Sequence, residues 1–170
     1  MLRSLQNHQV LTATPTPLYL YRMKKRSKKL TAQTKARAGE RIEFAKEIRR
    51  QYLAGDLEPA RTNAGLGFVI HEQGDGKPAK RNKIVEVHYI GLLAKDGSLF
   101  DDSFHGGRAI KFRLGQGEVI GGWDIGIGLL SEGDRATFFV PPALGYGSEG
   151  VEGIPARSEL IFYVELVCIS

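Results

Sequence analysis

The chain has 170 residues, of which 42% are hydrophobic and 25% are charged, and these values are typical of a globular protein with a single core. No stretch approaches the roughly 18 consecutive apolar residues that a membrane-spanning helix requires. Cys168 is the only cysteine, which excludes an internal disulfide and suits a reducing compartment. We therefore expect a cytoplasmic protein, with an organellar or periplasmic location as the alternative if the first residues are a targeting segment.

The net charge of +5 is distributed unevenly along the chain. Residues 1–39 contain nine Lys or Arg and no Asp or Glu, whereas the other fifteen basic and nineteen acidic residues give a net charge of −4. The densest basic run, residues 24–29, should stay unfolded because its like charges repel one another and few apolar residues flank it. Residues 1–38 are thus predicted to form a disordered basic tail. Any contact of this tail with a polyanion is expected to be weak and independent of sequence.

Apolar residues at three- and four-residue steps predict an amphipathic helix between Ala38 and Ala54. Gly55 follows as a C-terminal stop. The apolar stripe of this helix must be covered either by the domain that follows or by a second copy of the helix. We expect it to pack on its own domain and the chain to be a monomer. Residues 39–64 then comprise this helix and a linker.

From Gly65 onward the pattern changes to short alternating segments separated by glycine and proline, which indicates an antiparallel β-sheet. Asp96 and Gly97 supply the turn residues of a hairpin. Residues 85–89 alternate between apolar and polar side chains, so this strand should have one wet face. Cys168 continues the apolar phase of residues 160–166, which predicts a buried, inert thiol.

The second half of the chain has one helical pattern, formed by Val119, Trp123, Ile127 and Leu130. The glycines within it each cost about 1 kcal/mol relative to alanine, so local propensity cannot stabilise this helix. Packing must do so instead. A short helix enclosed by a curved antiparallel sheet satisfies this requirement.

This part of the chain contains seven short, separate motifs, at residues 87–89, 97–101, 112–115, 118–123, 133–136, 142–147 and 160–166. In this order and at these spacings they resemble the FKBP-type peptidyl-prolyl cis-trans isomerases, which are macrolide-binding immunophilins. The resemblance extends from about Gly65 to the last residue. It implies an α+β fold in which a curved antiparallel sheet, a half-barrel, wraps around a short α-helix, with residues 65–170 as the isomerase domain.

The resemblance also implies a site. Trp123 would be the floor of an apolar pocket, Asp101 would lie near the twisting carbonyl of the substrate, Tyr146 would donate a hydrogen bond, and the backbone N–H of Ile120 would hold another carbonyl. The implied substrate-binding residues are Tyr89, Phe100, Ile110, Phe112, Glu118, Val119, Trp123, Val151, Ile154 and Phe162. No cofactor and no metal are expected.

The sequence departs from the common family pattern around this site. Gly106 stands where an arginine often pairs with the pocket aspartate, so Asp101 lacks that partner unless Arg108 reaches it. Ile110 stands where an aromatic residue is frequent, and Val151 replaces a loop histidine. These departures affect the expected macrolide affinity and rate more than the expected fold.

The resemblance implies an enzyme that accelerates X-Pro isomerisation during protein folding, without a covalent intermediate, by removing water from the amide and stabilising its twisted form. Its partners would be proline-containing polypeptides and macrolide inhibitors. The alternative is a non-catalytic peptide-binding module that its basic N-terminal extension delivers to a partner. Because all the implied pocket residues lie between Tyr89 and Phe162, a chain beginning near Thr62 is expected to fold and keep most of its activity.

Overall fold

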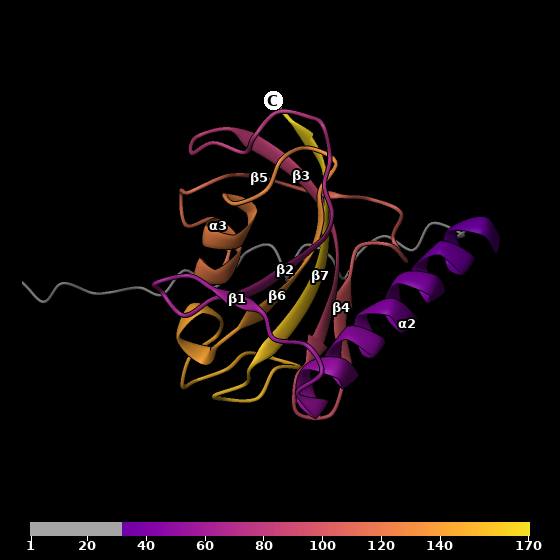
Figure 1. Cartoon of the computed structure of the whole chain (residues 1–170), viewed down its shortest axis with the longest axis vertical. Helices are drawn as coiled ribbons and strands as arrows, with labels where there is room; N and C mark the ends of the chain where they lie inside the picture. Colours follow the sequence, from indigo (N-terminus) through magenta and orange to yellow (C-terminus); the bar gives the residue numbers. More distant parts are fainter. Residues whose placement is uncertain (1–31) are drawn as a thin grey trace, which may run out of the picture.

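The computed structural model describes residues 32–170, and the predicted basic tail up to residue 31 lies outside them. In the described part, one curved antiparallel sheet separates two α-helices that lie on its opposite faces (Figure 1). The predicted α+β fold, with a short helix enclosed by the sheet and a further helix before it, is therefore confirmed. None of the described helices is long and apolar enough to cross a membrane.

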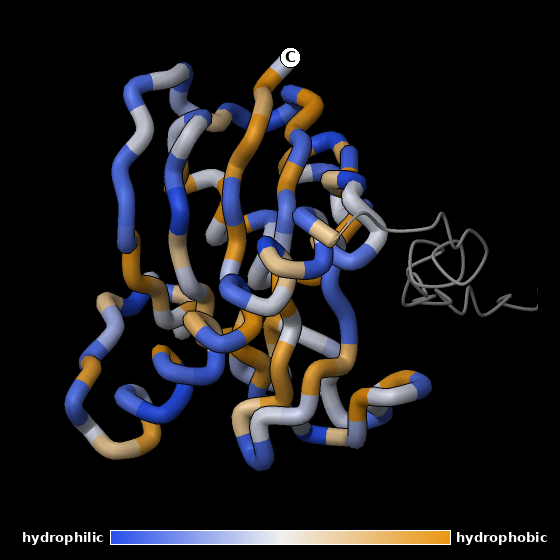
Figure 2. Tube along the Cα trace, turned by 90° about the vertical axis from the view of Figure 1, so that its right-hand side faces the viewer, coloured by the Kyte–Doolittle hydropathy of each residue, from blue (hydrophilic) through white to orange (hydrophobic). Residues whose placement is uncertain are grey.

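The sheet has the strand order β1-β2-β6-β7-β3-β4, and β5 pairs with β3 beside this path. Its strands are β1 (Ala60–Arg61), β2 (Gly67–Glu72), β3 (Ile84–Leu93), β4 (Leu99–Asp102), β5 (Ile110–Arg113), β6 (Arg135–Val140) and β7 (Leu160–Ile169). The two longest strands, β3 and β7, pair along nearly their whole length. Hydrophobic and hydrophilic residues alternate along the strand that leads to the C-terminus, β7 (Figure 2).

The concave face of the sheet holds the main core around the helix α3 (Gly121–Ile127). A Cβ atom on Gly122 would lie 2.7 Å from Val140, and one on Gly126 would lie 2.7 Å from Phe138. Only glycine therefore lets the helix approach β6 this closely, and the contact area gained offsets the poor helical propensity. The expectation that packing holds this helix is confirmed. A 3-10 turn, η1 (Pro142–Leu144), follows β6.

The helix α2 (Ala32–Ala54) covers the convex face of the sheet, as Figure 1 shows. Its residues Ala38, Ala45 and Ile48 are buried in a second core. The sheet contributes to this core the side chains of Ile90, Leu92, Phe139, Ile161 and Tyr163. The prediction that the helix packs on its own domain is thus confirmed.

Two polar anchors fix the C-terminal half of α2. The Arg49 guanidinium donates to the carbonyl oxygens of Ala94 (2.7 Å) and Lys95 (2.9 Å), which lie in the turn between β3 and β4. The Tyr52 hydroxyl donates to the Glu159 carboxylate at 2.9 Å, just before β7. The two Arg49 bonds satisfy carbonyls of the hairpin that carries part of the pocket, so α2 and the hairpin form one unit, and the Tyr52 bond ties α2 to the segment before β7.

The structure corrects the predicted boundaries and one predicted face. The helix begins at Ala32 rather than Ala38, and residues 60–61 of the predicted linker pair with β2 as strand β1. The polar face predicted for residues 85–89 is wet only at its start, because α2 covers the strand from His88 onward and His88 itself is half-buried. A helix that lies on a sheet face hides side chains that strand alternation alone assigns to solvent.

The prediction of a buried Cys168 is also corrected. The pairing of β7 with β3 shifts in register between Glu86 and Val87. This irregularity changes the alternation, so Val167 is 47% exposed, Cys168 is half-buried and Ile169 is buried.

Candidate functional site

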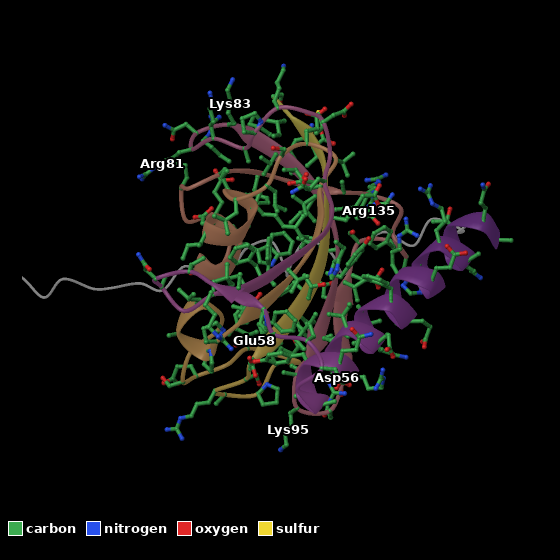
Figure 3. The ribbon with its side chains drawn as sticks, viewed as in Figure 1. Asp56, Glu58, Arg81, Lys83, Lys95 and Arg135 are labelled. Atoms are coloured by element: carbon green, nitrogen blue, oxygen red, sulfur yellow. The ribbon has the colours of Figure 1, made fainter. Side chains whose placement is uncertain are left out.

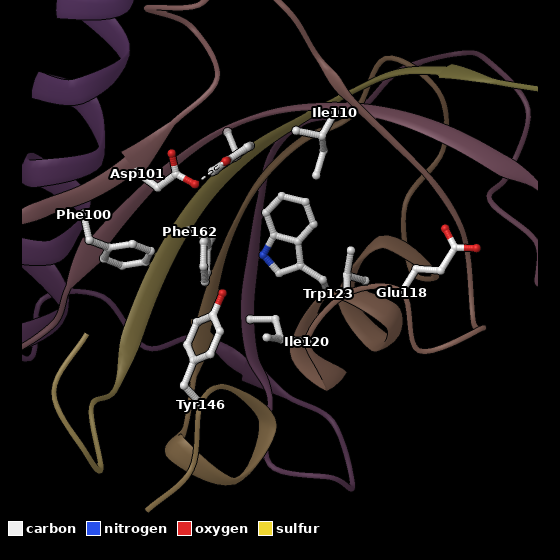
Figure 4. Close-up of a pocket in the computed structure, with 10 residues that line it drawn as sticks. Phe100, Asp101, Ile110, Glu118, Ile120, Trp123, Tyr146 and Phe162 are labelled. Atoms are coloured by element: carbon white, nitrogen blue, oxygen red, sulfur yellow. Dashed lines mark hydrogen bonds between the residues drawn. The ribbon is translucent and has the colours of Figure 1, made fainter. Parts of the chain in front are cut away.

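A pocket of about 390 Å³ opens on the concave side of the sheet, beside the N-terminal end of α3 (Figure 4). Ten residues line it: Tyr89, Phe100, Asp101, Ile110, Glu118, Val119, Ile120, Trp123, Tyr146 and Phe162. The lining is mostly aromatic and aliphatic, so a bound group would be separated from water on several sides.

Trp123 forms the floor, and its position is fixed by the rings around it. The indole is 4% exposed and lies nearly perpendicular to Tyr89 (ring centroids 5.1 Å apart, 81°) and to Phe162 (5.4 Å, 85°). Phe100 in turn lies perpendicular to Phe162 at 5.5 Å. Edge-to-face pairs of this kind are each worth about 0.5 to 1.5 kcal/mol beyond their burial, so the pocket wall is rigid.

The carboxylate of Asp101 lies at the pocket edge and is held by two donors. The Tyr89 hydroxyl donates to its Oδ2 at 2.5 Å, and the backbone N–H of Asp102 donates to its Oδ1 at 2.9 Å. Burial raises the pKa of Asp101 above its ordinary value of 3.8; the bonds from Tyr89 and Asp102 act in the opposite direction, and repulsion from the Asp102 carboxylate adds to the rise.

No ion pair of Asp101 occurs among residues 32–170. The exposed Arg108 forms no ion pair with it, and a Cβ on Gly106 would meet nothing closer than the Ser103 carbonyl at 3.8 Å. The Tyr89 hydroxyl is thus the side-chain donor to this carboxylate among the described residues. Tyr89 was predicted to be a pocket wall, whereas its hydrogen bond to Asp101 was not predicted.

Ser103 is a buried polar residue that the sequence analysis missed. Its Oγ accepts from the backbone N–H of Tyr89 at 2.8 Å, and its own N–H donates to the Tyr89 carbonyl at 3.1 Å. A second contact joins its Oγ to Nδ1 of His88 at 2.9 Å. Ser103 thereby fixes the backbone of the residue whose side chain holds Asp101. A serine just after two pocket residues gives no periodic signal by which the sequence could have revealed it.

The hydroxyl of Tyr146 points into the pocket from the loop after η1 (Figure 4). It has no hydrogen-bond partner among the described residues. Burial, together with the negative charge of Asp101, raises the pKa of Tyr146 to about 12. The hydroxyl therefore keeps its proton at neutral pH and remains a free hydrogen-bond donor.

Ile120 directly precedes α3 and lines the pocket. The Ile120 N–H makes no hydrogen bond to another described residue. The Ile120 carbonyl accepts from the N–H groups of Trp123 at 2.9 Å and Asp124 at 3.2 Å. The Asp124 carboxylate accepts from the N–H groups of Gly115 (2.8 Å) and Gly117 (2.9 Å) and so ties the preceding loop to the helix. Asp124 is a second positioning residue that the sequence analysis missed.

The structure gathers ten of the thirteen predicted site residues around the pocket. Phe112, Val151 and Ile154 are not among the lining residues. Phe112 is 5% exposed and lies behind Trp123, with ring centroids 5.9 Å apart, so it supports the floor from the core side. Val151 and Ile154 face each other across a β-bridge in the loop that follows Tyr146. Contact of these three residues with substrate stays a prediction.

The polar groups of the site suit peptide binding. Glu118, at the rim, has its carboxylate engaged by the backbone N–H of Arg113 at 2.9 Å. Among residues 32–170, no cluster of His, Cys, Asp or Glu has the arrangement of a metal site. The fold and the pocket together thus define a half-barrel domain that binds an apolar group flanked by hydrogen-bonding carbonyls.

Comparison with known proteins assigns this domain to a family. Residues 75–167 match the model of the FKBP-type peptidyl-prolyl cis-trans isomerases. Because this match spans more than half of the chain, the chain belongs to the FKBP-type peptidyl-prolyl cis-trans isomerase family.

Individual relatives agree with this assignment. FK506-binding protein 2 of Emericella nidulans is 47% identical over 105 residues, which are 61% of this chain and 78% of that protein. Peptidyl-prolyl cis-trans isomerase FKBP53 of Arabidopsis thaliana is 44% identical over 106 residues, which are 59% of this chain but only 22% of the relative. The crystal structure of FkpA from Escherichia coli superposes with a TM-score of 0.64 at 34% identity and covers 82% of this chain and 63% of that chain. Several matched relatives are therefore much longer than this chain.

Proposed function

We propose that this protein is an active peptidyl-prolyl cis-trans isomerase that accelerates X-Pro isomerisation in folding polypeptides. The observation that carries this proposal is the water-poor pocket over Trp123, which presents only a few polar groups. Family membership supports the same activity. The aromatic walls of the pocket suit an apolar ring, and the proline ring is an apolar group that is attached to a rotatable amide.

The mechanism follows from the electronic structure of the amide. Resonance between the nitrogen lone pair and the carbonyl opposes rotation with a barrier of about 18 to 20 kcal/mol. The planar amide is more polar than the twisted one. Transfer from water to the apolar pocket therefore destabilises the planar ground state more than the twisted transition state, and the barrier falls without a covalent intermediate.

Three polar groups act on the flanking atoms. A twisted carbonyl carbon loses electron density from nitrogen, so the Asp101 carboxylate next to it stabilises the transition state electrostatically. The protonated Tyr146 hydroxyl donates to a substrate carbonyl, and the free N–H of Ile120 donates to another. The remaining lining residues position the proline ring and exclude water.

Proline-containing polypeptides are the proposed substrates, and macrolides are the proposed inhibitors. The name of the Emericella relative, FK506-binding protein 2, supports this class of inhibitor. The lone, half-buried Cys168 is compatible with the proposed cytoplasmic location. We also propose that the protein is a monomer, since α2 buries Ala38, Ala45 and Ile48 against its own sheet rather than against a second copy. A non-catalytic module remains the competing hypothesis.

A proline-isomerisation assay separates the two hypotheses. A short peptide with one X-Pro bond is mixed with catalytic amounts of the protein, with and without a macrolide. An isomerase accelerates the slow phase in proportion to protein concentration, and a bound macrolide suppresses this effect. Peptide binding without acceleration would instead establish the non-catalytic module.

The rate is expected to fall on the acid side of neutrality because of Asp101. Its pKa lies above 3.8, so protonation, which removes the stabilising charge, begins at a higher pH than for an ordinary aspartate. Tyr146 keeps its proton through the neutral range. The measurement is kcat/KM against pH for the protein and for Asp101→Asn. The variant should be slower at neutral pH and lack the acid limb; an acid limb that persists in the variant would assign the titration to another group.

Tyr146→Phe should have a modest effect on turnover. The substitution removes one hydrogen-bond donor and leaves no buried charge behind. Such a loss costs about 0.5 to 1.5 kcal/mol, which corresponds to a fall in kcat/KM of roughly two- to twelve-fold. The fold should not change, because this hydroxyl bonds to no described residue. Complete loss of activity in a folded variant would show that the hydroxyl does more than donate one bond.

A further inference from the structure

Four cations gather on one surface away from the pocket lining. Lys80, Arg81 and Lys83 lie on the turn that precedes β3, and Arg113 lies at the end of β5; all four are exposed. We refer to these four residues as the basic patch. It stands out because the chain after residue 39 is acidic overall, with fifteen basic and nineteen acidic residues.

Hydrogen bonds join the two segments that carry the basic patch. Nη1 of Arg113 donates to the carbonyl of Asn82 at 2.9 Å, and the amide of Gln116 donates to Oδ1 of Asn82 at 2.6 Å. The Asn82 N–H donates to the Leu114 carbonyl at 2.9 Å. Asn82 itself has a φ of 72°, in the left-handed region that asparagine tolerates better than most residues. The turn and the loop after β5 are thus joined, so the backbone from which the four cations project is held in place.

The charges of the basic patch are uncompensated. None of its four side chains forms an ion pair with a described residue, in contrast to the neighbouring Lys111, which pairs with Glu86 at 2.7 Å. Two carboxylates contact the end of β5 and the loop after it, and both accept from backbone N–H groups rather than from the Arg113 guanidinium: Glu118 from Arg113, and Asp124 from Gly115 and Gly117. Figure 3 shows Arg81 and Lys83 projecting away from the body of the domain.

We propose that the basic patch binds the phosphate backbone of nucleic acid without reading its sequence. Lysine and arginine neutralise phosphates by charge and counterion release, which requires no base contact. The patch contains no aromatic residue that would stack on bases, and the exposed large apolar residues of the described chain, Phe44, Leu53, Leu99, Leu129 and Val167, all lie outside it. A protein partner would usually need such apolar anchors, so the phosphate backbone is favoured over an acidic polypeptide.

The proposal does not depend on the isomerase activity, because no patch residue lines the pocket. It also assigns binding to the folded domain, in addition to any contact made by residues 1–39. The full chain is therefore the right material for a test, since both variants below keep the whole N-terminal segment.

The test measures the affinity for a fluorescent 20-base-pair DNA duplex by anisotropy between 50 and 200 mM salt. The patch variant is Lys80→Gln with Lys83→Gln. The matched control is Lys46→Gln with Lys95→Gln, which makes the same change in charge on α2 and at the opposite end of the domain (Figure 3). We expect the patch variant to bind about tenfold more weakly at 50 mM salt and its salt slope to fall by about two, roughly 0.9 for each lost phosphate contact, with the control unchanged.

Three results would overturn the proposal. If both variants bind the duplex equally more weakly, the binding depends on the overall charge of the protein or on the N-terminal segment. If the unaltered chain does not bind the duplex at 50 mM salt, nucleic acid is excluded as the ligand. Polyglutamate of equal charge could bind more tightly than the duplex and lose this binding in the patch variant. That result would identify the partner as an acidic polypeptide instead.

Discussion

Replacing Trp123 by alanine is expected to reduce the affinity for a proline peptide at least a hundredfold. The indole is the floor of the pocket and is 4% exposed, in contact with the rings of Tyr89, Phe112 and Phe162. Truncating a buried aromatic residue costs about 3 to 5 kcal/mol in a core, and each 1.4 kcal/mol is tenfold in affinity. Peptide titration by calorimetry measures the effect directly.

A matched variant separates loss of the floor from loss of the fold. Trp123→Phe retains an aromatic ring, so it should stay folded by urea denaturation and recover part of the affinity. In the unaltered chain, fluorescence of the only tryptophan reports peptide binding. Because the ligand displaces water above the indole ring, the emission should change saturably with peptide concentration. Full affinity in the alanine variant, or saturable binding with silent emission, would move the ligand site away from residues 119–123.

Removing α2 is expected to lower the free energy of unfolding by at least about 3 kcal/mol. A chain that begins at Asp56 exposes Ile90, Leu92, Phe139 and Ile161, which are all 0% exposed beneath the helix. Each fully buried side chain of this size contributes about 1.5 to 3 kcal/mol, and partial burial by neighbouring strands reduces the total. The urea midpoint should fall accordingly, and activity should fall with it because α2 also anchors the hairpin that carries Phe100 and Asp101.

A chain that begins at Ala32 is the control, since it keeps all of α2. It should match the full chain in both unfolding midpoint and rate. This expectation differs from the one drawn from the sequence, in which a chain beginning near Thr62 folds and works alone. A truncated chain without α2 that keeps the full midpoint and rate would restore the simpler view and reduce the helix to an appendage.

The sequence predicted the fold well where one periodicity decided the outcome. The glycine-rich pattern around Trp123 required packing to hold a helix, and the structure supplies β6 at 2.7 Å from an added Cβ. The local sequence pattern did not predict burial correctly where two elements that are distant in sequence pack together. Strand alternation assigned residues 85–89 a wet face because nothing in the strand indicates that α2 covers it, and a register shift opposite Cys168 leaves no trace in hydropathy.

The site could be predicted to a similar extent. Motif resemblance named every residue that lines the pocket, but it also included Phe112, which sits one layer behind the floor. The partners that hold these residues could not be predicted. The bond from Tyr89 to Asp101, the clamp of Ser103 on Tyr89 and the bonds from Asp124 to the preceding loop depend on side-chain orientation, which spacing along the chain does not determine.

Exchange NMR on a short peptide with a single X-Pro bond tests the central claim most directly, because it observes the cis and trans forms without a coupled protease. With substoichiometric protein, the exchange rate should rise in proportion to protein concentration, and Trp123→Ala should abolish the rise. An exchange rate that stays at its uncatalysed value while the peptide is seen to bind, or an undiminished rate in the alanine variant, would contradict an isomerase site over Trp123.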